Sequence, residues 1–171
     1  METTLMTKCL FEFIGTLVLV LLGDGVVAST VLKRSKGYGG GWVVITMAWG
    51  FAVMCGVLIA GPWSGAHLNP AVSVGLAVAG SFPWAYVPGY IIAQLLGGFC
   101  GAVLVYLYYK DHFDATDEPE TKLGVFCTMP AIMNKPRNFF CEAVGTFLLV
   151  FVILAIGNEL NTPEIGMGSL G

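Results

Sequence analysis

Long apolar runs, separated by short polar stretches, dominate this chain. Four of them are long enough to cross a bilayer as helices, because the hydrocarbon core takes roughly 20 apolar residues. These predicted spans cover about residues 9–32, 42–60, 84–109 and 139–157. No Asp, Glu, Lys or Arg occurs between Gly37 and Tyr109, so that stretch cannot form a water-facing surface. The pattern predicts an all-α membrane protein that crosses the bilayer several times.

A further apolar run, which ends at Ala79, has only about half the length that spanning needs and is typical of a re-entrant or buried segment. Gly61 and Pro62 are expected to break the second span before it. Asn69 and Pro70 then predict a new helix start inside the membrane, because Asn is a favoured N-cap and Pro a favoured first helical residue. We therefore predict a re-entrant half-helix over residues 69–79.

The stretch before this half-helix, from Gly65 to Leu68, is predicted to be non-helical. Unpaired carbonyls at membrane depth are tolerated only where they line a cavity or are buried in protein. The Asn69 amide adds donors, and the helix N-terminus adds about half a positive charge, which repels cations and protons. The segment therefore predicts a polar file for hydroxyl-bearing neutral solutes, formed by Gly65, Ala66, His67, Leu68, Asn69, Pro70 and Ala71.

An internal repeat divides the chain. The pattern Glu-x-x-Gly-Thr begins at Glu12 and again at Glu142. Three predicted spans lie between the two starts, an odd number, so the second copy enters from the opposite side as an inverted repeat. Residues 1–136 form a first half, with a connector over 110–136, and residues 137–171 form the start of a second. A second Asn-Pro-Ala element would fall near about residue 200, beyond this chain.

Here a family resemblance becomes specific. Ser64-Gly65-Ala66-His67-Leu68-Asn69-Pro70-Ala71-Val72 resembles the first signature of the major intrinsic protein family, the aquaporins and glycerol facilitators. The resemblance extends over residues 8–157 and includes Ala93-Gln94-x-x-Gly97. It implies an aquaporin-like inverted-repeat bundle, assembled as a homotetramer with one pore per subunit. This chain would hold four transmembrane helices plus one re-entrant half-helix.

Trp49 indicates the branch of the family. It stands where the sequence resembles glycerol facilitators, whereas strict water channels usually have Phe there, although an ordinary packing or lipid-facing aromatic is the alternative. Phe126-Cys127-Thr128-Met129-Pro130 is similar to a Phe-x-Thr-x-Pro element of the glycerol branch. The resemblance thus implies a passive channel for glycerol and similar small neutral solutes. A water-selective or broader channel (urea, lactic acid, dihydroxyacetone) and a secondary transporter are the alternatives.

Ionisable residues within the spans point to bracing rather than catalysis. In the resembling family two glutamates hold the pore loops, and Glu12 and Glu142 match those positions. Two separated histidines and scattered cysteines give no catalytic or metal constellation, so no enzyme activity, cofactor or nucleic-acid partner is expected. His112 is expected to be a solvated loop residue, and Asp24 to be solvated near the membrane interface.

Charge leaves the orientation in conflict. All Lys and Arg residues except Lys8 follow the first span or lie in and beside the connector, which the positive-inside rule would place in the cytoplasm. The resemblance instead implies a cytoplasmic N-terminus in the plasma membrane, and we follow it. It also implies a constriction Arg in the second half, which this chain lacks. The 171-residue chain alone is therefore expected not to conduct selectively.

Overall fold

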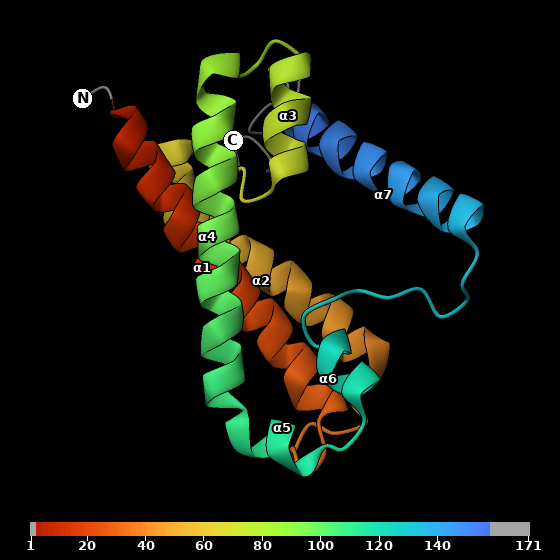
Figure 1. Ribbon diagram of the computed structural model, residues 1–171. Coiled ribbons are helices and arrows are strands. Elements are labelled where there is room, and N and C mark those ends of the chain that lie inside the picture. The colour runs from red at the N-terminus through yellow and green to blue at the C-terminus, as the bar shows by residue number, and fades with distance from the viewer. Residues whose placement is uncertain (1–2, 158–171) are drawn as a thin grey trace, which may run out of the picture.

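The computed structural model describes residues 3–157, which form helices and connecting loops without a strand. Four helical segments have the length and apolarity to cross a membrane, as the sequence predicted. They are α1 (Leu5–Val31), α2 (Gly41–Ser64), the short η1 (Trp84–Tyr86) continued by α4 (Val87–Tyr108), and α7 (Lys135–Ile156). The shorter helices are α3 (Pro70–Val78), α5 (Lys110–Ala115) and α6 (Pro119–Gly124) (Figure 1).

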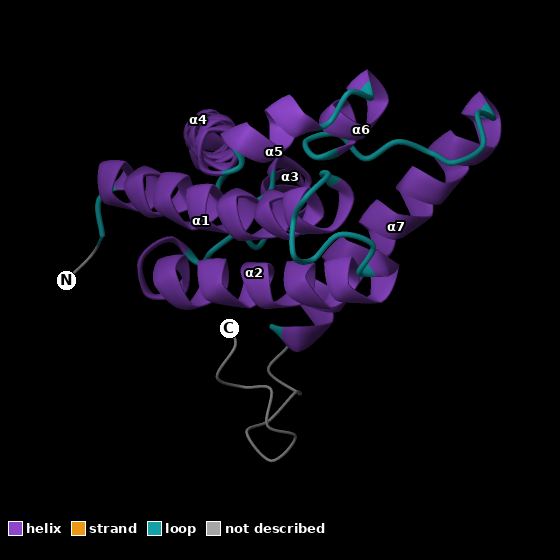
Figure 2. Ribbon diagram, turned by 90° about the horizontal axis from the view of Figure 1, so that it is seen from below, coloured by secondary structure: helices purple, strands orange, loops and turns teal. Residues whose placement is uncertain are grey.

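Helix α1 lies between α2 and α4 (Figures 1 and 2). Glycine allows the close approach on the α4 side, where a Cβ on Gly101 would lie 2.7 Å from the carbonyl oxygen of Leu17. Gly97 likewise lies against the backbone of Phe13 and Leu17. These two glycines, four residues apart, therefore form a small-residue seam on α4 that packs against α1.

The predicted break at Gly61 and Pro62 is wrong. Helix α2 continues through Pro62 to Ser64 and ends at Gly65, which adopts a left-handed conformation with φ of 83°. An internal proline costs about 3 kcal/mol or more, because it removes one hydrogen bond and crowds the preceding turn. Tertiary contacts hold the last turn in place, since Ser64 binds residues of both α1 and α4, as described below.

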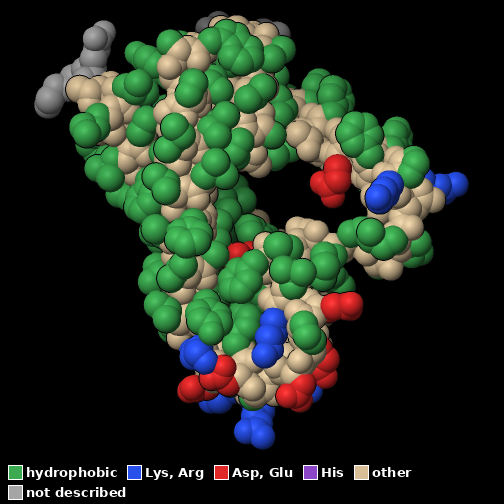
Figure 3. All heavy atoms as spheres, in the orientation of Figure 1, with side chains coloured by type: hydrophobic (Ala, Val, Ile, Leu, Met, Phe, Trp, Pro, Cys, Tyr) green, Lys and Arg blue, Asp and Glu red, His purple; other side chains and the backbone are tan. Residues whose placement is uncertain are grey.

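Helix α7 stands apart from the bundle. Its described side chains are all exposed or half-buried, and its contact with the rest runs through α3, where Val150 lies against Gly75. The space-filling view shows an open gap between α7 and the connector end of the molecule (Figure 3).

The connector is folded rather than extended. Phe113 of α5 and Val125 after α6 are buried against Ala28, Leu32 and Val105 at the ends of α1 and α4. Many of the charged side chains visible in Figure 3 gather at this same end. The connector therefore caps the end of the bundle with a small apolar core of its own.

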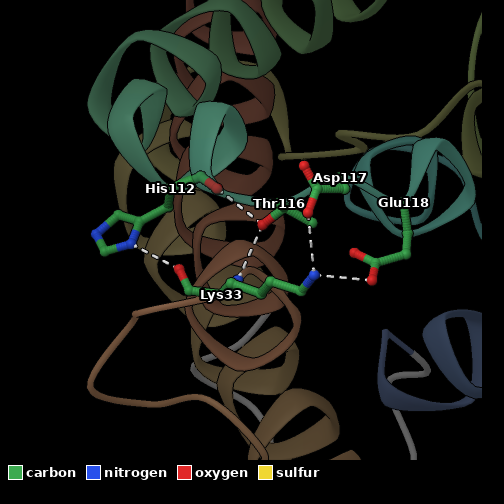
Figure 4. Close-up of polar contacts among 5 residues, drawn as sticks. All are labelled: Lys33, His112, Thr116, Asp117 and Glu118. Atoms are coloured by element: carbon green, nitrogen blue, oxygen red, sulfur yellow. Dashed lines mark hydrogen bonds and ion pairs between the residues drawn. The ribbon is translucent and has the colours of Figure 1, made fainter.

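Lys33 fastens this cap to α1 (Figure 4). Its backbone N–H donates to Thr116 Oγ1 at 2.9 Å, and its carbonyl lies 3.1 Å from His112 Nδ1. Its ammonium donates to Glu118 at 2.8 Å and lies 3.5 Å from Asp117. His112, expected to be a solvated loop residue, is half-buried, because the folded connector turns its ring onto the backbone that follows α1.

Candidate functional site

The chain reverses direction between α2 and α3 (Figure 1). Gly65, Ala66 and Leu68 all have positive φ, of 83°, 49° and 53°. Only glycine adopts this region freely, so the conformations of Ala66 and Leu68 each cost of the order of 1–3 kcal/mol. Such a strained loop persists only where its surroundings hold it.

Glu12 of α1 is the main support of this loop. Its Oε1 accepts hydrogen bonds from Ser64 Oγ at 2.6 Å and from the His67 N–H at 2.9 Å. Its Oε2 accepts from the Leu68 N–H at 2.8 Å. The Ala66 N–H donates to Ser64 Oγ at 3.1 Å, so three consecutive backbone donors turn toward one buried cluster.

The direction of these donors fixes the direction of the carbonyls. In a trans peptide the C=O of one residue points opposite to the N–H of the next. Because the N–H groups of residues 66–68 point at the Glu12 cluster, the carbonyls of residues 65–67 point away from it. Within residues 3–157 none of the four carbonyls of residues 65–68 accepts a hydrogen bond. The loop thus offers a run of free acceptors on the face away from Glu12.

Helix α4 braces the loop from a second side. Tyr90 is fully buried and donates its hydroxyl to the Ser64 carbonyl at 2.7 Å. Gln94, one turn later, donates to Glu12 Oε2 at 2.8 Å and to Ser73 Oγ at 3.0 Å. The His67 ring lies 3.0 Å from Ser73 Oγ through Nδ1 and packs edge-on against Phe82. Three helices therefore converge on one short loop.

Asn69 begins the half-helix. Its backbone is extended, and its Oδ1 accepts from the Ala71 N–H at 2.8 Å, while Pro70 occupies the first helical position. With Oδ1 engaged, the side-chain amide nitrogen is left as a donor without a partner within residues 3–157. Asn69, Pro70 and Ala71 are all half-buried, at the junction between the loop carbonyls and α3.

Trp49 lies one helix away from the loop, on α2. A Cβ placed on Gly23 of α1 would be 2.5 Å from its Cζ3 atom, so the indole packs directly against the α1 backbone. The side chain is half-buried. Leu68 occupies a similar position on the same helix pair, nearer the N-terminus of α1, between Gly15 and Gly56. Both the loop and the indole therefore rest on glycines of the α1–α2 contact.

Two ionisable residues of interest lie outside this network. Glu142 on α7 is exposed and has no hydrogen bond or ion pair within residues 3–157. Asp24 is only 8% exposed, contrary to the expectation of solvation, and its carboxylate has no partner in the described part of the chain. Asp24 is buried because helical spacing places it on the same side of α1 as Leu17, Val20 and Ala28, the residues that meet α4.

The described residues also contain polar atoms that stay unpaired. Thr16 Oγ1 and Gln94 Oε1 are buried without a hydrogen-bond partner, both beside the Glu12 cluster. Within residues 3–157, no three His, Cys, Asp or Glu side chains lie close enough to share a metal ion.

Sequence reasoning did not select Tyr90, Gln94, Ser64 and Ser73 as site residues. Gln94 carried a signal, because it is the one amide or charged side chain of α4, and polar residues inside spans tend to serve a specific contact. Tyr90 and Ser73 carried none, since a Tyr or Ser in a membrane helix is an ordinary packing residue.

Comparison with known proteins gives a consistent result. The family profile described as "Major intrinsic protein" matches residues 1–168. The chain is 54% identical over 152 residues to the "Probable glycerol uptake facilitator protein" of Thermotoga maritima, covering 89% of this chain and 65% of the relative. It is 52% identical over 155 residues to "Glycerol uptake facilitator protein 3" of Lactiplantibacillus plantarum, covering 91% of this chain and 65% of the relative. The chain thus spans 65% of the length of each of these two relatives.

A solved structure is also similar. The aquaglyceroporin from Plasmodium falciparum superposes with a TM-score of 0.61 at 39% sequence identity. The match covers 65% of this chain and 45% of that structure. The aquaporin-like, all-helical fold expected from the sequence is therefore confirmed for the part of the fold that this chain contains.

Proposed function

Because the chain belongs to the major intrinsic protein family, we propose that the full-length protein is a passive transmembrane channel for glycerol and similar small neutral solutes. The observation that carries the proposal is the run of carbonyls over residues 65–68, which accept no hydrogen bond within residues 3–157, in the loop that Glu12 braces. The names of the relatives, glycerol uptake facilitators, support glycerol as the solute.

The chain's own groups define the passage of a polyol. The carbonyls of residues 65–68 accept hydrogen bonds from solute hydroxyls, and the Asn69 amide donates to them. The half-buried indole of Trp49 offers an apolar wall to the carbon backbone. The positive end of α3 opposes cations and protons. Each contact is transient, and no covalent bond forms or breaks.

We propose the same division of the chain that its repeat indicates. Residues 1–136 supply one half of the pore, and residues 137–171 begin the other. In this arrangement Glu142 braces the second pore loop as Glu12 braces the first. Its exposure within residues 3–157 agrees with a partner that lies elsewhere in the full-length protein.

The assembly is proposed to be a homotetramer in the plasma membrane. The apolar side chains that α2 leaves exposed support a surface that faces lipid or a neighbouring subunit. They include Trp42, Met47, Phe51 and Leu58, which are 57–71% exposed. Cross-linking of the detergent-solubilised full-length protein tests the subunit number.

The N-terminus is proposed to be cytoplasmic, which places the loop between α1 and α2 outside. Tyr38 in this loop is 60% exposed and suits a labelling test. In a variant that lacks the native cysteines, Tyr38→Cys should react with a membrane-impermeant thiol reagent in intact cells. Labelling only after lysis would reverse the orientation.

Glycerol flux tests the proposed function directly. Proteoliposomes with the full-length protein should swell in glycerol at a rate that rises linearly with the glycerol gradient. Imposed ion gradients should not change this rate. Trp49→Arg should abolish this flux, whereas Trp42→Arg, at an exposed position of the same helix, should not. Saturable uptake driven by an ion gradient would identify a secondary transporter instead.

A further inference from the structure

Gly23 lies under the face of the Trp49 indole. A Cβ on Gly23 would be 2.5 Å from Cζ3 and 2.6 Å from both Cε3 and Cη2. Nearly equal distances to three neighbouring ring atoms occur only above the face of a ring, because a point beyond its edge would be much farther from the two outer atoms. The α1 backbone therefore covers one face of the six-membered ring.

This contact requires glycine. Real Cβ atoms essentially never approach other heavy atoms within 3.0 Å, so any side chain at position 23 must displace the ring or the helix. Glycine inside a helix is disfavoured relative to alanine, and close packing is the usual reason to keep it. A Cβ on Gly25, two residues later on the same helix, would meet no heavy atom of a neighbouring helix within 4 Å, so position 25 carries no such requirement.

The helix itself has little freedom to yield. On the α4 side Leu17 and Val20 lie against Gly101, and on the α2 side Gly15 lies against Ala60. A methyl group at position 23 would therefore push the indole away from α1 more readily than it would separate the helices. The ring face that is not covered by α1 would move with it.

We propose that Gly23 is a positioning residue that sets the solute selectivity of the channel through Trp49. The proposal rests on the proposed function, in which Trp49 forms the apolar wall of the pore. Because Gly23 has no side chain, the Trp49 indole packs close to α1 at the margin of the pore. The pore then keeps the width that a three-carbon polyol needs. Water, being smaller, depends far less on this width.

Permeability measurements on the full-length protein in proteoliposomes test this role. Gly23→Ala should lower the ratio of glycerol to water permeability by roughly tenfold, the lower end of the discrimination that one methyl group gives in a close-fitting site. Gly25→Ala is the matched control and should leave the ratio unchanged. Equal effects of the two substitutions would overturn the proposal.

A double-mutant cycle separates seating of the ring from general damage to the helix. Trp49→Phe removes the outer part of the ring that a methyl group at position 23 would meet. Adding Gly23→Ala to Trp49→Phe should therefore change the permeability ratio much less than adding it to the wild type. Additive effects in the two backgrounds would overturn the proposal.

The same double mutant also tests the proposal if Gly23→Ala alone fails to fold. If Gly23→Ala alone does not assemble in the membrane, the added Trp49→Phe should restore assembly, and failure in that background too would overturn the proposal. A wild-type protein that conducts no glycerol would refute the proposed function. A wild type that conducts glycerol and is insensitive to Gly23→Ala would refute only the role of Gly23.

Discussion

The Leu68 N–H donates to Oε2 of Glu12 at 2.8 Å, across 56 residues of sequence. This bond joins the first membrane span to the last residue before the half-helix. Leu68 has a positive φ of 53°, a left-handed conformation that is unfavourable for a leucine. The hydrogen bond to Glu12 therefore helps to hold the backbone in this conformation. Four donors surround the buried carboxyl group of Glu12, from Ser64, His67, Leu68 and Gln94.

Glu12→Gln should unfold or strongly destabilise the re-entrant loop. A glutamine presents an NH₂ group where the carboxylate has an acceptor, so at least one backbone donor of the loop loses its partner and faces another donor. We expect the free energy of unfolding to fall by about 1–3 kcal/mol for each buried donor that loses its acceptor. Thermal unfolding of the detergent-solubilised full-length protein measures this loss.

Glu118→Gln is the control for this substitution, since Glu118 lies at the surface of the connector and its loss should barely shift the melting temperature. Equal shifts for the two variants would contradict the bracing role of Glu12.

Tyr90→Phe should weaken the second brace without disturbing the aromatic packing. It removes the hydroxyl that donates to the Ser64 carbonyl at 2.7 Å and leaves the ring against His67 and Phe82. A buried carbonyl without a partner costs about 1–3 kcal/mol. Tyr38→Phe, at an exposed position, should cost nothing measurable. Chemical denaturation in mild detergent can compare them, and an unchanged Tyr90→Phe would show that water replaces the hydroxyl.

Asn69→Asp should separate helix capping from charge selection. Aspartate keeps the acceptor for the Ala71 N–H, so the start of α3 should stay intact. Its negative charge, however, offsets the positive end of α3 in the pore. We expect near wild-type stability together with a cation or proton leak, measured as dissipation of an imposed gradient in proteoliposomes. Asn69→Ala should show the reverse, a loss of about 1 kcal/mol of stability and no leak.

The connector contact at Lys33 should depend on pH. The hydrogen bond from Lys33 lowers the pKa of Glu118, and the same bond raises the pKa of Lys33. A lowered carboxyl pKa stabilises the contact above the unfolded-state pKa, and this contribution disappears as the pH falls through the lowered value. The raised pKa of Lys33 stabilises the contact below the unfolded-state pKa of lysine. This contribution is lost only in strong alkali, where the pH rises through the raised value. Hydrogen exchange of residues 116–124, corrected for intrinsic rates, should therefore rise in acid.

Lys33→Met is the control for the pH effect. It removes both carboxylate contacts but keeps the backbone bonds of residue 33 to Thr116 and His112. The acid-dependent rise in exchange should be much smaller in this variant. If the acid-dependent rise in exchange is as large in Lys33→Met as in the wild type, groups other than the Lys33–Glu118 pair determine the pH dependence of the connector.

The sequence by itself determined the spans and the half-helix. Apolar runs of spanning length predict helices because no other backbone state satisfies its hydrogen bonds in hydrocarbon. The start of α3 was equally local, since the Asn69 cap and the Pro70 ring act within one helical turn. Both kinds of signal lie within a short window of sequence, which is why they can be read without a structure.

Only the tertiary structure decided what holds the loop and where α2 ends. Pro62 breaks a helix by local rules, but Ser64 stays helical because Glu12 and Tyr90 bind it from other helices. Gly23 has no local need to be glycine and is required only because α2 brings Trp49 against it. These roles depend on contacts between residues far apart in the chain, and such contacts exist only once the helices have packed.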